Sequence, residues 1–360
     1  MHVTIQEETV QEVAMSAQIE SFGLTSSQEP VTAVTLCNET LRCRLISYSA
    51  AIQSLSVPSK DGAFVDVVLG YDTLREYQEN TGCLGAVCGR YANRICKGSF
   101  RIDKTVYQLN INNGPNHLHG GPSGYNTRNW TVDSVTDTNV TLSIDSPDGD
   151  ENYPGHLHLT VSYSIDASSL CIRYLAESDR KTICNITNHS YFNLSGHDSG
   201  PMLDQIAVLY ADTFTPIDET LIPTGEIVSV QNTPFDFTSP HRIGERISAD
   251  DTQLKNGNGY DHNYVLNGSN EKIHPFAEVY SEKTGICMRG FTTSPGVQFY
   301  TGNHLTERAG KCGTFYGPHS GFCLETQFFP DSPNHPNFPS TILEPGQCFD
   351  QMTRLEFSVK

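Results

Sequence analysis

The sequence predicts an all-β protein, built as one large antiparallel β-sandwich with few short helices. Segments of strand length recur from about residue 31 to the end of the 360-residue chain, each rich in alternating, β-branched or aromatic residues. Dipeptides that form tight turns stand between these segments. The 29 glycines and 19 prolines are spread along the chain and do not cluster into a linker. We therefore expect a single β-sandwich domain over residues 31–360.

The predicted strands follow one another along the whole chain. They cover residues 44–57, 65–70, 139–145, 157–165, 170–176, 286–293 and 353–359. Turns are predicted at Asp61-Gly62, Asn113-Gly114-Pro115, Asp148-Gly149, Asn267-Gly268 and Pro345-Gly346. Among the segments that do not read as strands, residues 72–78 (DTLREYQ) form a helical turn or two. Strands at this spacing favour an antiparallel sandwich.

The first 30 residues differ from the rest, and we expect an acidic N-terminal extension that packs loosely. They carry several glutamates and no Lys or Arg, and they lack the apolar run of a signal peptide. The eleven cysteines contain no C-x-x-C pair, which favours reduced, mostly buried thiols. No stretch approaches the length of a membrane-spanning helix. These features predict a cytoplasmic protein.

The charge balance excludes several kinds of partner. The chain has 41 acidic and 23 basic residues, a formal net charge of -18. Such a surface repels nucleic-acid phosphates and anionic lipid, so we expect neither nucleic acid nor a membrane as a partner. A small neutral substrate fits better, and nothing in the sequence predicts an obligate protein partner.

One acidic residue stands inside a predicted strand. The segment GFCLETQFFPDSPNHP (321–336) begins like a buried strand, and its alternation places Phe322, Leu324 and Thr326 on one face. Glu325 points to the opposite face. That face is either the solvated side of an antiparallel sheet or the wall of a cleft in which Glu325 is a base.

Four further segments are richer in polar groups and glycine than a plain sheet requires. They are GRYANRI (89–95), NHLHGG (116–121), TNHSYFNLSG (187–196) and NGNGYDHNYVL (256–266). His189, in the third, is either a core histidine bonded to the backbone or a site residue. His117 and His119 share one face if their segment is extended, and the two glycines after His119 allow a ligand to approach the backbone.

Pairs of the form His-x-His also raise the possibility of a zinc site. Besides His117 and His119, the chain contains His156 and His158. The second pair lies in an alternating strand with leucines on the opposite face, so it is more simply the polar side of that strand.

Asp261 follows a loop with two glycines and is either a turn residue or a ligand-binding carboxylate. Gln298, in PGVQFYTGN (295–303), is either a solvent-facing strand residue or a binding residue. If all these segments converge on one cleft, they supply hydrogen-bonding side chains beside aromatic residues. A neutral sugar needs this combination, because each hydroxyl exchanges its water partners for protein ones. One carboxylate and one imidazole then supply a general base and a general acid.

Seven segments in order resemble one known family. They are GAVCGRYANRICKGSF, NHLHGG, TNHSYFNLSG, ETLIPTGE, GYDHNYVL, PGVQFYTGN and HSGFCLETQFFPD. The resemblance is to the aldose 1-epimerase, or galactose mutarotase, family and runs from about residue 31 to 359. It implies a single β-sandwich of the galactose mutarotase-like supersandwich type. The implied activity interconverts the α and β anomers of free hexoses such as galactose and glucose, without a cofactor or metal ion.

The resemblance also implies roles for individual residues. Glu325 matches the general base and His189 the general acid. His119 and Arg94 match the neighbours that hold the substrate and stabilise charge near the ring oxygen. The groups that bind sugar hydroxyls are matched by Asn93, Asp261 and Gln298, together with Arg94.

Two features depart from the family pattern, and three alternatives stay open. The acidic extension is not part of the pattern, and His117 stands where a small polar residue is more usual. A hexose-6-phosphate mutarotase on the same fold needs more Lys and Arg at the cleft mouth. A glycosidase needs two carboxylates, for which Glu325 and Asp261 are available. A non-catalytic sugar-binding module needs the aromatic and hydroxyl-binding residues but neither Glu325 nor His189.

Overall fold

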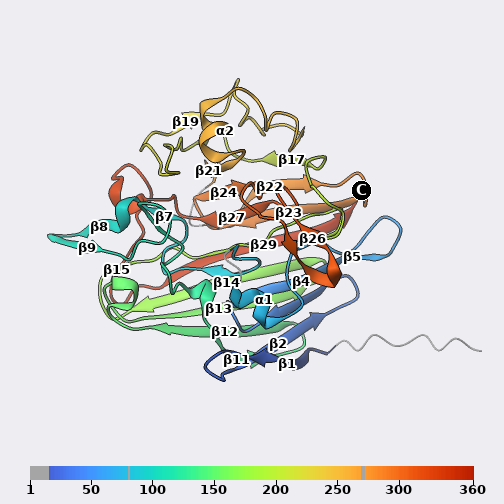
Figure 1. Cartoon of the computed structure of the whole chain (residues 1–360), viewed down its shortest axis with the longest axis horizontal. Coiled ribbons are helices and arrows are strands. Elements are labelled where there is room, and N and C mark those ends of the chain that lie inside the picture. The colour runs from blue at the N-terminus through green and yellow to red at the C-terminus, as the bar shows by residue number, and fades with distance from the viewer. Residues whose placement is uncertain (1–15, 80–81, 269–271) are drawn as a thin grey trace, which may run out of the picture.

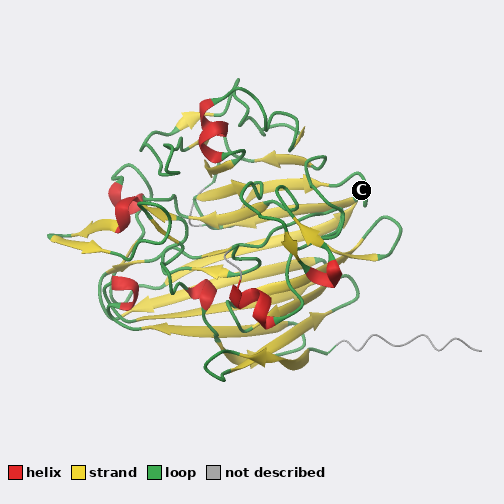
Figure 2. Cartoon of the chain, in the orientation of Figure 1, coloured by secondary structure: helices red, strands yellow, loops and turns green. Residues whose placement is uncertain are grey.

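The computed structural model describes residues 16–79, 82–268 and 272–360, and its regular structure consists mainly of β-strands joined by loops (Figures 1 and 2). In these residues there are two α-helices, α1 (Leu74–Glu79) and α2 (Thr252–Gly257). Short 3-10 turns are η1 (Cys96–Gly98), η2 (Tyr125–Thr127), η3 (Asp150–Asn152), η4 (Lys311–Gly313) and η5 (Ser332–Asn334). The predicted all-β class with few short helices is confirmed.

The largest sheet in the described residues has nine antiparallel strands. In spatial order they are β11 (Thr131–Val135), β12 (Asn139–Ser146), β13 (Leu157–Asp166), β14 (Ser169–Ser178), β29 (Phe349–Val359), β23 (Ile286–Thr292), β22 (His274–Tyr280), β17 (Ile206–Leu209) and β20 (His241–Arg242). Five of the predicted strands lie in this sheet, because long alternating runs are the clearest strand signal in a sequence.

Two five-stranded antiparallel sheets accompany it in the described part of the chain. The first contains β1 (Gln18–Leu24), β2 (Pro30–Cys37), β3 (Arg42–Ile46), β4 (Ala51–Pro58) and β5 (Phe64–Asp66). The second contains β19 (Val228–Ser229), β18 (Thr213–Phe214), β21 (Asp261–Val265), β24 (Gly296–Tyr300) and β27 (Cys323–Gln327). The run predicted as one strand over 44–57 is two strands, since Ser49 and Ala50 adopt φ of 63° and 45° and turn the chain.

Short two-stranded pairs complete the described strands. They are β6 (Val87–Cys88) with β16 (Thr187–Asn188), β7 (Arg94–Ile95) with β10 (His117–Leu118), β8 (Ser99–Ile102) with β9 (Thr105–Gln108), β15 (Thr182–Ile183) with β28 (Ile342–Leu343), and β25 (Arg308–Ala309) with β26 (Phe315–Tyr316). Two of these pairs, β6 with β16 and β7 with β10, join polar segments that are far apart in the sequence.

The three large sheets share one apolar core. A single cluster of buried side chains includes Leu45 and Leu55 of the first five-stranded sheet, Leu142 and Val161 of the nine-stranded sheet, and Val297 of the second five-stranded sheet. Sheets that bury their apolar faces against one another in this way form a sandwich. The opposite face of β21, β24 and β27 is polar, and it supports the site described below.

Part of the predicted N-terminal extension is ordered as a strand. β1 pairs antiparallel with β2, and most of its side chains are exposed. Residues 1–15 of the predicted extension lie outside the described residues. The division into an extension and a single domain stays a prediction.

Neither α1 nor α2 is long enough to cross a bilayer, and the described residues contain no other helix that qualifies.

A buried lysine ties the loop after β24 to the first five-stranded sheet. The Lys311 ammonium lies 2.6 Å from the Asp66 carboxylate and donates to the carbonyl oxygens of Gln53 (2.9 Å) and Val68 (2.8 Å). Burial lowers the pKa of Lys311, and the Asp66 charge opposes that shift. All three donors of the ammonium are therefore used inside the protein.

We expect Lys311→Met to reduce the free energy of unfolding by about 2–3 kcal/mol, because it leaves the partly buried Asp66 carboxylate and two carbonyl oxygens without their donor. Urea denaturation of both proteins measures the change. The control is Lys255→Met, which removes an exposed ion pair with Asp250 and should leave stability nearly unchanged. If the two substitutions change the free energy of unfolding equally, the buried contacts of Lys311 do not stabilise the fold.

Candidate active site

A pocket of about 240 Å³ lies on the polar side of the second five-stranded sheet. It is lined by Gly82, Cys83, Asn93, Arg94, Asn113, Leu118, His119, His189, Tyr191, Asp261, Tyr300, His304, Leu305, Arg308 and Glu325. Six of the seven predicted site residues are in this lining, and the seventh, Gln298, is hydrogen-bonded to one of them. The polar segments of the sequence therefore do meet in one place.

Glu325 reaches the pocket from the middle of β27. Its Cα lies opposite Gln298 of β24, which in turn lies opposite Asn263 of β21. Residues opposite one another in antiparallel strands share a face, so these three side chains point the same way. Leu324 and Thr326 point to the core. The Glu325 side chain is 3% exposed, and the alternative of a solvated sheet face is therefore wrong.

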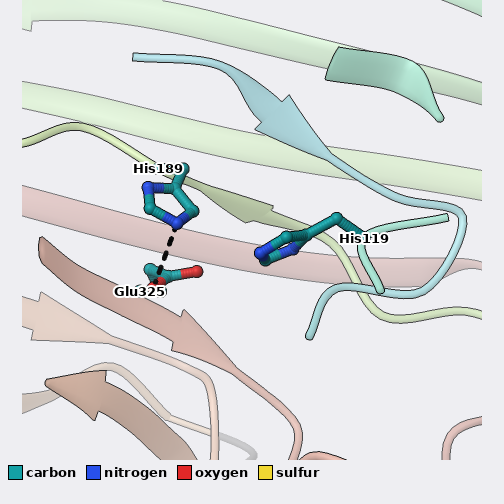
Figure 3. A group of neighbouring side chains, drawn as sticks. All are labelled: His119, His189 and Glu325. Carbon is teal, nitrogen blue, oxygen red and sulfur yellow. Dashed lines mark ion pairs between the residues drawn. The ribbon is translucent and has the colours of Figure 1, made fainter. Parts of the chain in front are cut away.

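His189 follows directly after β16, and backbone hydrogen bonds to the segment before β6 fix its position. Its N–H donates to the carbonyl of Ala86 (2.8 Å), and its carbonyl accepts from the N–H of Gly85 (3.0 Å). The ring Nε2 lies 3.6 Å from Glu325 Oε1, the contact dashed in Figure 3. The other ring nitrogen, Nδ1, lies 3.5 Å from Cys323 Sγ. His189 is thus a buried histidine that faces the carboxylate.

His119 comes from the turn after β10, and its ring converges on the other two side chains (Figure 3). The backbone N–H of Asn93 donates to His119 Nδ1 at 3.1 Å, and the N–H of His119 donates back to the Asn93 carbonyl at 3.1 Å. A backbone N–H is only a donor, so Nδ1 is unprotonated and the hydrogen of the neutral ring is on Nε2. Neutral His119 therefore presents a hydrogen-bond donor at Nε2.

His117 and His119 do not share a face. His119 adopts φ of 52°, so the segment is not extended there and its ring turns away from that of His117. The His117 ring is instead buried against the Asn110 carbonyl and the Tyr153 hydroxyl, both at 2.6 Å from its nitrogens. We conclude that His117 has a structural position outside the pocket.

Three groups in the pocket have the spacing of metal ligands. One ligand atom each from His119, His189 and Glu325 lies within 4.8 Å of the others. A histidine ligand offers a lone pair, however, and the two nitrogens of neutral His119 offer none, since Nδ1 already accepts the Asn93 N–H and Nε2 carries the hydrogen. This chemistry fits hydrogen bonding to a sugar better than metal binding.

The second His-x-His pair lies on the exposed side of the nine-stranded sheet. Both His156 and His158 face Asp145, at 3.2 and 3.1 Å. Their rings are about half exposed, as expected for the polar side of β13.

The predicted hydroxyl-binding residues form one connected group. Gln298 Nε2 donates to Asp261 Oδ1 at 2.7 Å, and Arg94 Nη1 lies 4.0 Å from Asp261 Oδ2. Arg94 Nε donates to Asn113 Oδ1 at 3.0 Å, and its backbone N–H donates to Asn93 Oδ1 at 2.8 Å. These bonds fix the directions in which the remaining donors and acceptors point into the pocket.

The lining also contains residues that no motif indicated. Asn113 belongs to a predicted turn, His304 and Leu305 come from the loop after β24, and Arg308 is the first residue of β25. That loop lacks a recognisable pattern in the sequence. Its backbone is positioned by long-range contacts such as the one made by Lys311.

Burial dominates the titration of the central pair. It raises the pKa of the Glu325 carboxyl well above its usual value, and the charge of Asp261 raises that pKa further while Arg94 lowers it. Burial also lowers the pKa of His189 to about 4 and that of His119 well below its usual value. Each shift disfavours a charge, so Glu325 and His189 hold one proton between them over a wide pH range.

The raised pKa of Glu325 predicts a pH-dependent difference in stability between the wild type and Glu325→Gln. Between the unfolded pKa of about 4.5 and the raised folded pKa, the folded protein holds a proton that the unfolded chain releases, so wild-type stability falls as the pH rises. Glutamine does not titrate. The Tm of Glu325→Gln minus that of the wild type should therefore grow in calorimetry as the pH rises above about 4.5. A difference that shrinks over this range would contradict the raised pKa.

Comparison with known proteins points to one family. The family model for aldose 1-epimerase matches residues 32–356. The chain is 45% identical to galactose mutarotase of Homo sapiens over 340 residues, 94% of this chain and 97% of the relative. It is 35% identical to aldose 1-epimerase of Escherichia coli over 342 residues, 94% of this chain and 98% of the relative.

Solved structures agree with these relatives. An aldose epimerase homologue from C. elegans superposes with a TM-score of 0.84 at 30% identity, covering 91% of this chain and 98% of the other. Galactose 1-epimerase from Lactobacillus acidophilus gives a TM-score of 0.84 at 28% identity, covering 96% and 99%. The family-model match over residues 32–356 includes every segment that lines the pocket, and the chain belongs to the aldose 1-epimerase family.

Proposed function

We propose that this protein is an aldose 1-epimerase that interconverts the α and β anomers of free aldohexoses such as D-galactose and D-glucose. One observation carries the proposal. A buried carboxylate, Glu325, and a buried imidazole, His189, lie 3.6 Å apart in a pocket lined mainly by hydrogen-bonding and aromatic side chains. This arrangement suits a neutral substrate that must lose one proton and gain another.

In the proposed ring opening, Glu325 takes the proton of the anomeric hydroxyl while His189 gives a proton to the ring oxygen. The C1–O5 bond breaks, and the open-chain aldehyde is left beside a protonated Glu325 and a neutral His189. Rotation about the C1–C2 bond presents the other face of the aldehyde. In the ring closure, His189 takes the proton of the C5 hydroxyl as its oxygen attacks C1, and Glu325 returns a proton to O1.

The pKa shifts suit this exchange of roles. In water, a carboxylate and an imidazolium would hold the proton firmly on the histidine, because their pKa values differ by about two units. Burial raises the pKa of Glu325 and lowers that of His189, so both shifts reduce the preference for the proton on histidine. A proton donor and acceptor matched in this way serve both directions of a reversible reaction.

The remaining predicted residues hold the sugar in this account. His119 donates from Nε2 toward the ring oxygen, and Arg94 places positive charge nearby. Asp261 accepts hydrogen bonds from sugar hydroxyls, and Gln298 orients its carboxylate by donating at 2.7 Å. Asn93 fixes the tautomer of His119. These contacts bind the sugar at groups other than C1 and leave C1 free to rotate.

We further propose that the enzyme works in the cytoplasm without a cofactor or an obligate protein partner. The support is the cysteine usage and the acidic composition of the sequence, together with the pocket's own acid and base.

Polarimetry of freshly dissolved α-D-galactose and α-D-glucose tests the proposal. The protein should speed the relaxation to the same final rotation that buffer alone reaches. Methyl α-D-galactopyranoside, which has no proton on O1, should show no change, whereas a glycosidase would hydrolyse it. Faster relaxation of glucose 6-phosphate than of glucose would indicate the hexose-6-phosphate alternative. Sugar binding without faster relaxation would indicate a binding module.

A further inference from the structure

The polar face that carries Glu325 continues beneath the pocket as a group of buried amides. Asn263, Gln298 and Glu325 lie opposite one another on β21, β24 and β27. Two residues further along β27, Gln327 points to the same face, opposite Gly296 of β24. The base therefore has amide side chains next to it across the strands and along its own strand.

These side chains have polar atoms that make no hydrogen bond to any described residue. They are both side-chain polar atoms of Asn263, both of Gln327, Oε1 of Gln298 and Oε2 of Glu325. The side chains are nearly inaccessible to solvent, at 1% exposure for Asn263 and Gln327 and 3% for Gln298. Polar atoms buried in native proteins are almost always bonded to protein or to ordered water, so these atoms point to a ligand.

The sugar does not account for all of them. Asn263, Gln298 and Gln327 are absent from the lining of the pocket, whereas Glu325 is part of it. The space between Asn263 and Gln327 is also narrow, since a Cβ on the intervening Gly296 would lie 2.5 Å from Asn263 Oδ1 and 3.0 Å from the Phe329 ring. The ligand is therefore small.

The chemistry of the unpartnered atoms identifies the kind of ligand. The amide nitrogens of Asn263 and Gln327 are donors, while their oxygens, Gln298 Oε1 and Glu325 Oε2 are acceptors. A small molecule that serves both must itself donate and accept hydrogen bonds. Water does so and bonds two to four such groups at buried sites.

We propose that ordered water molecules, bound by Asn263, Gln298 and Gln327, donate hydrogen bonds to Oε2 of Glu325. The other carboxylate oxygen, Oε1, is the one that faces His189 at 3.6 Å and is left for the anomeric proton. Gln327 and Asn263 are then positioning residues for the base, which act through water. This inference rests on the proposed function of Glu325 as the base.

The proposal has a consequence for titration. Hydrogen bonds donated to a carboxylate favour its charged form and lower its pKa, so the waters oppose the effect of burial on Glu325. Removing the amide that holds them should raise the pKa of Glu325 further.

The test is the pH dependence of kcat and KM in Gln327→Met, measured by polarimetry with α-D-galactose. Methionine has nearly the shape of glutamine without its polar atoms. The matched control is Gln205→Met, since Gln205 is equally buried but both of its side-chain groups bond protein, to Leu194 N–H and to Asn193 Oδ1. Asn263→Leu repeats the test if Gln327→Met does not fold.

We expect kcat of Gln327→Met to fall by about tenfold with little change in KM, and the alkaline limb of its pH profile to move up by about one unit. Gln205→Met should lower Tm and leave the profile in place. If the wild type is active and the pH profile of kcat does not move in Gln327→Met, the proposed water site is wrong. A rise in the Tm of Gln327→Met would also contradict the water site, because it would mean that the amide had no partner to lose. An inactive wild type would instead overturn the proposed function.

Discussion

Replacing Glu325 with glutamine is expected to lower kcat for mutarotation of galactose by about 10²–10⁴-fold. Glutamine keeps the size and the hydrogen-bonding oxygen of the side chain but cannot take the anomeric proton. Its buried position at 2% exposure leaves bulk water poorly placed to substitute as the base. Polarimetry under saturating galactose measures kcat, and calorimetric titration measures whether galactose still binds.

The control for this substitution is Glu278→Gln. Glu278 is on β22 in the nine-stranded sheet and pairs with Arg289 and Lys360, away from the pocket lining. Its substitution should leave kcat unchanged. If Glu325→Gln keeps more than about a tenth of wild-type kcat, the proton goes to another group.

Replacing His189 with asparagine is expected to lower kcat by a similar factor, about 10²–10⁴-fold, because the ring oxygen then loses its proton donor. Asparagine is close to imidazole in width and can still form hydrogen bonds, so the pocket should stay intact. Rates of galactose mutarotation across the pH range measure the effect.

A matched histidine separates this role from a structural one. His117→Asn removes a buried imidazole that bonds Tyr153 and Asn110 outside the pocket, so Tm should fall while kcat stays near that of the wild type. In the double substitution of Glu325 and His189, the loss should be about that of one single substitution, since the two proton transfers occur in the same ring-opening step. Losses that multiply would show that the two residues act independently.

Much of the fold follows from local patterns. The strands of the nine-stranded sheet are long and alternate clearly, and period-2 alternation also placed Glu325 on the face opposite Leu324. The alternation of apolar and polar residues could not decide whether that face was exposed to solvent or buried. The answer depends on loops from elsewhere in the chain that cover it. The resemblance of the motifs to a known family supplied the roles of the site residues.

Other features depend on tertiary structure and leave no trace in a single sequence. The turn at His119 requires a positive φ, which neither the segment's composition nor its spacing reveals. The segment that carries His304 and Arg308 is placed by Lys311, whose partners Asp66 and Gln53 are more than 200 residues earlier in the chain. The amides beside Glu325 look like ordinary surface residues until the register of the strands is known.

The central claim is that Glu325 carries the anomeric proton in a reaction that runs in both directions. Two-dimensional exchange NMR of galactose at anomeric equilibrium tests it most directly, because it detects interconversion without net change. With the wild type, we expect exchange cross-peaks between the α and β anomeric signals that buffer alone does not give, and with Glu325→Gln we expect them to vanish. Cross-peaks of equal strength in the Glu325→Gln protein would contradict the account and place the base elsewhere in the pocket.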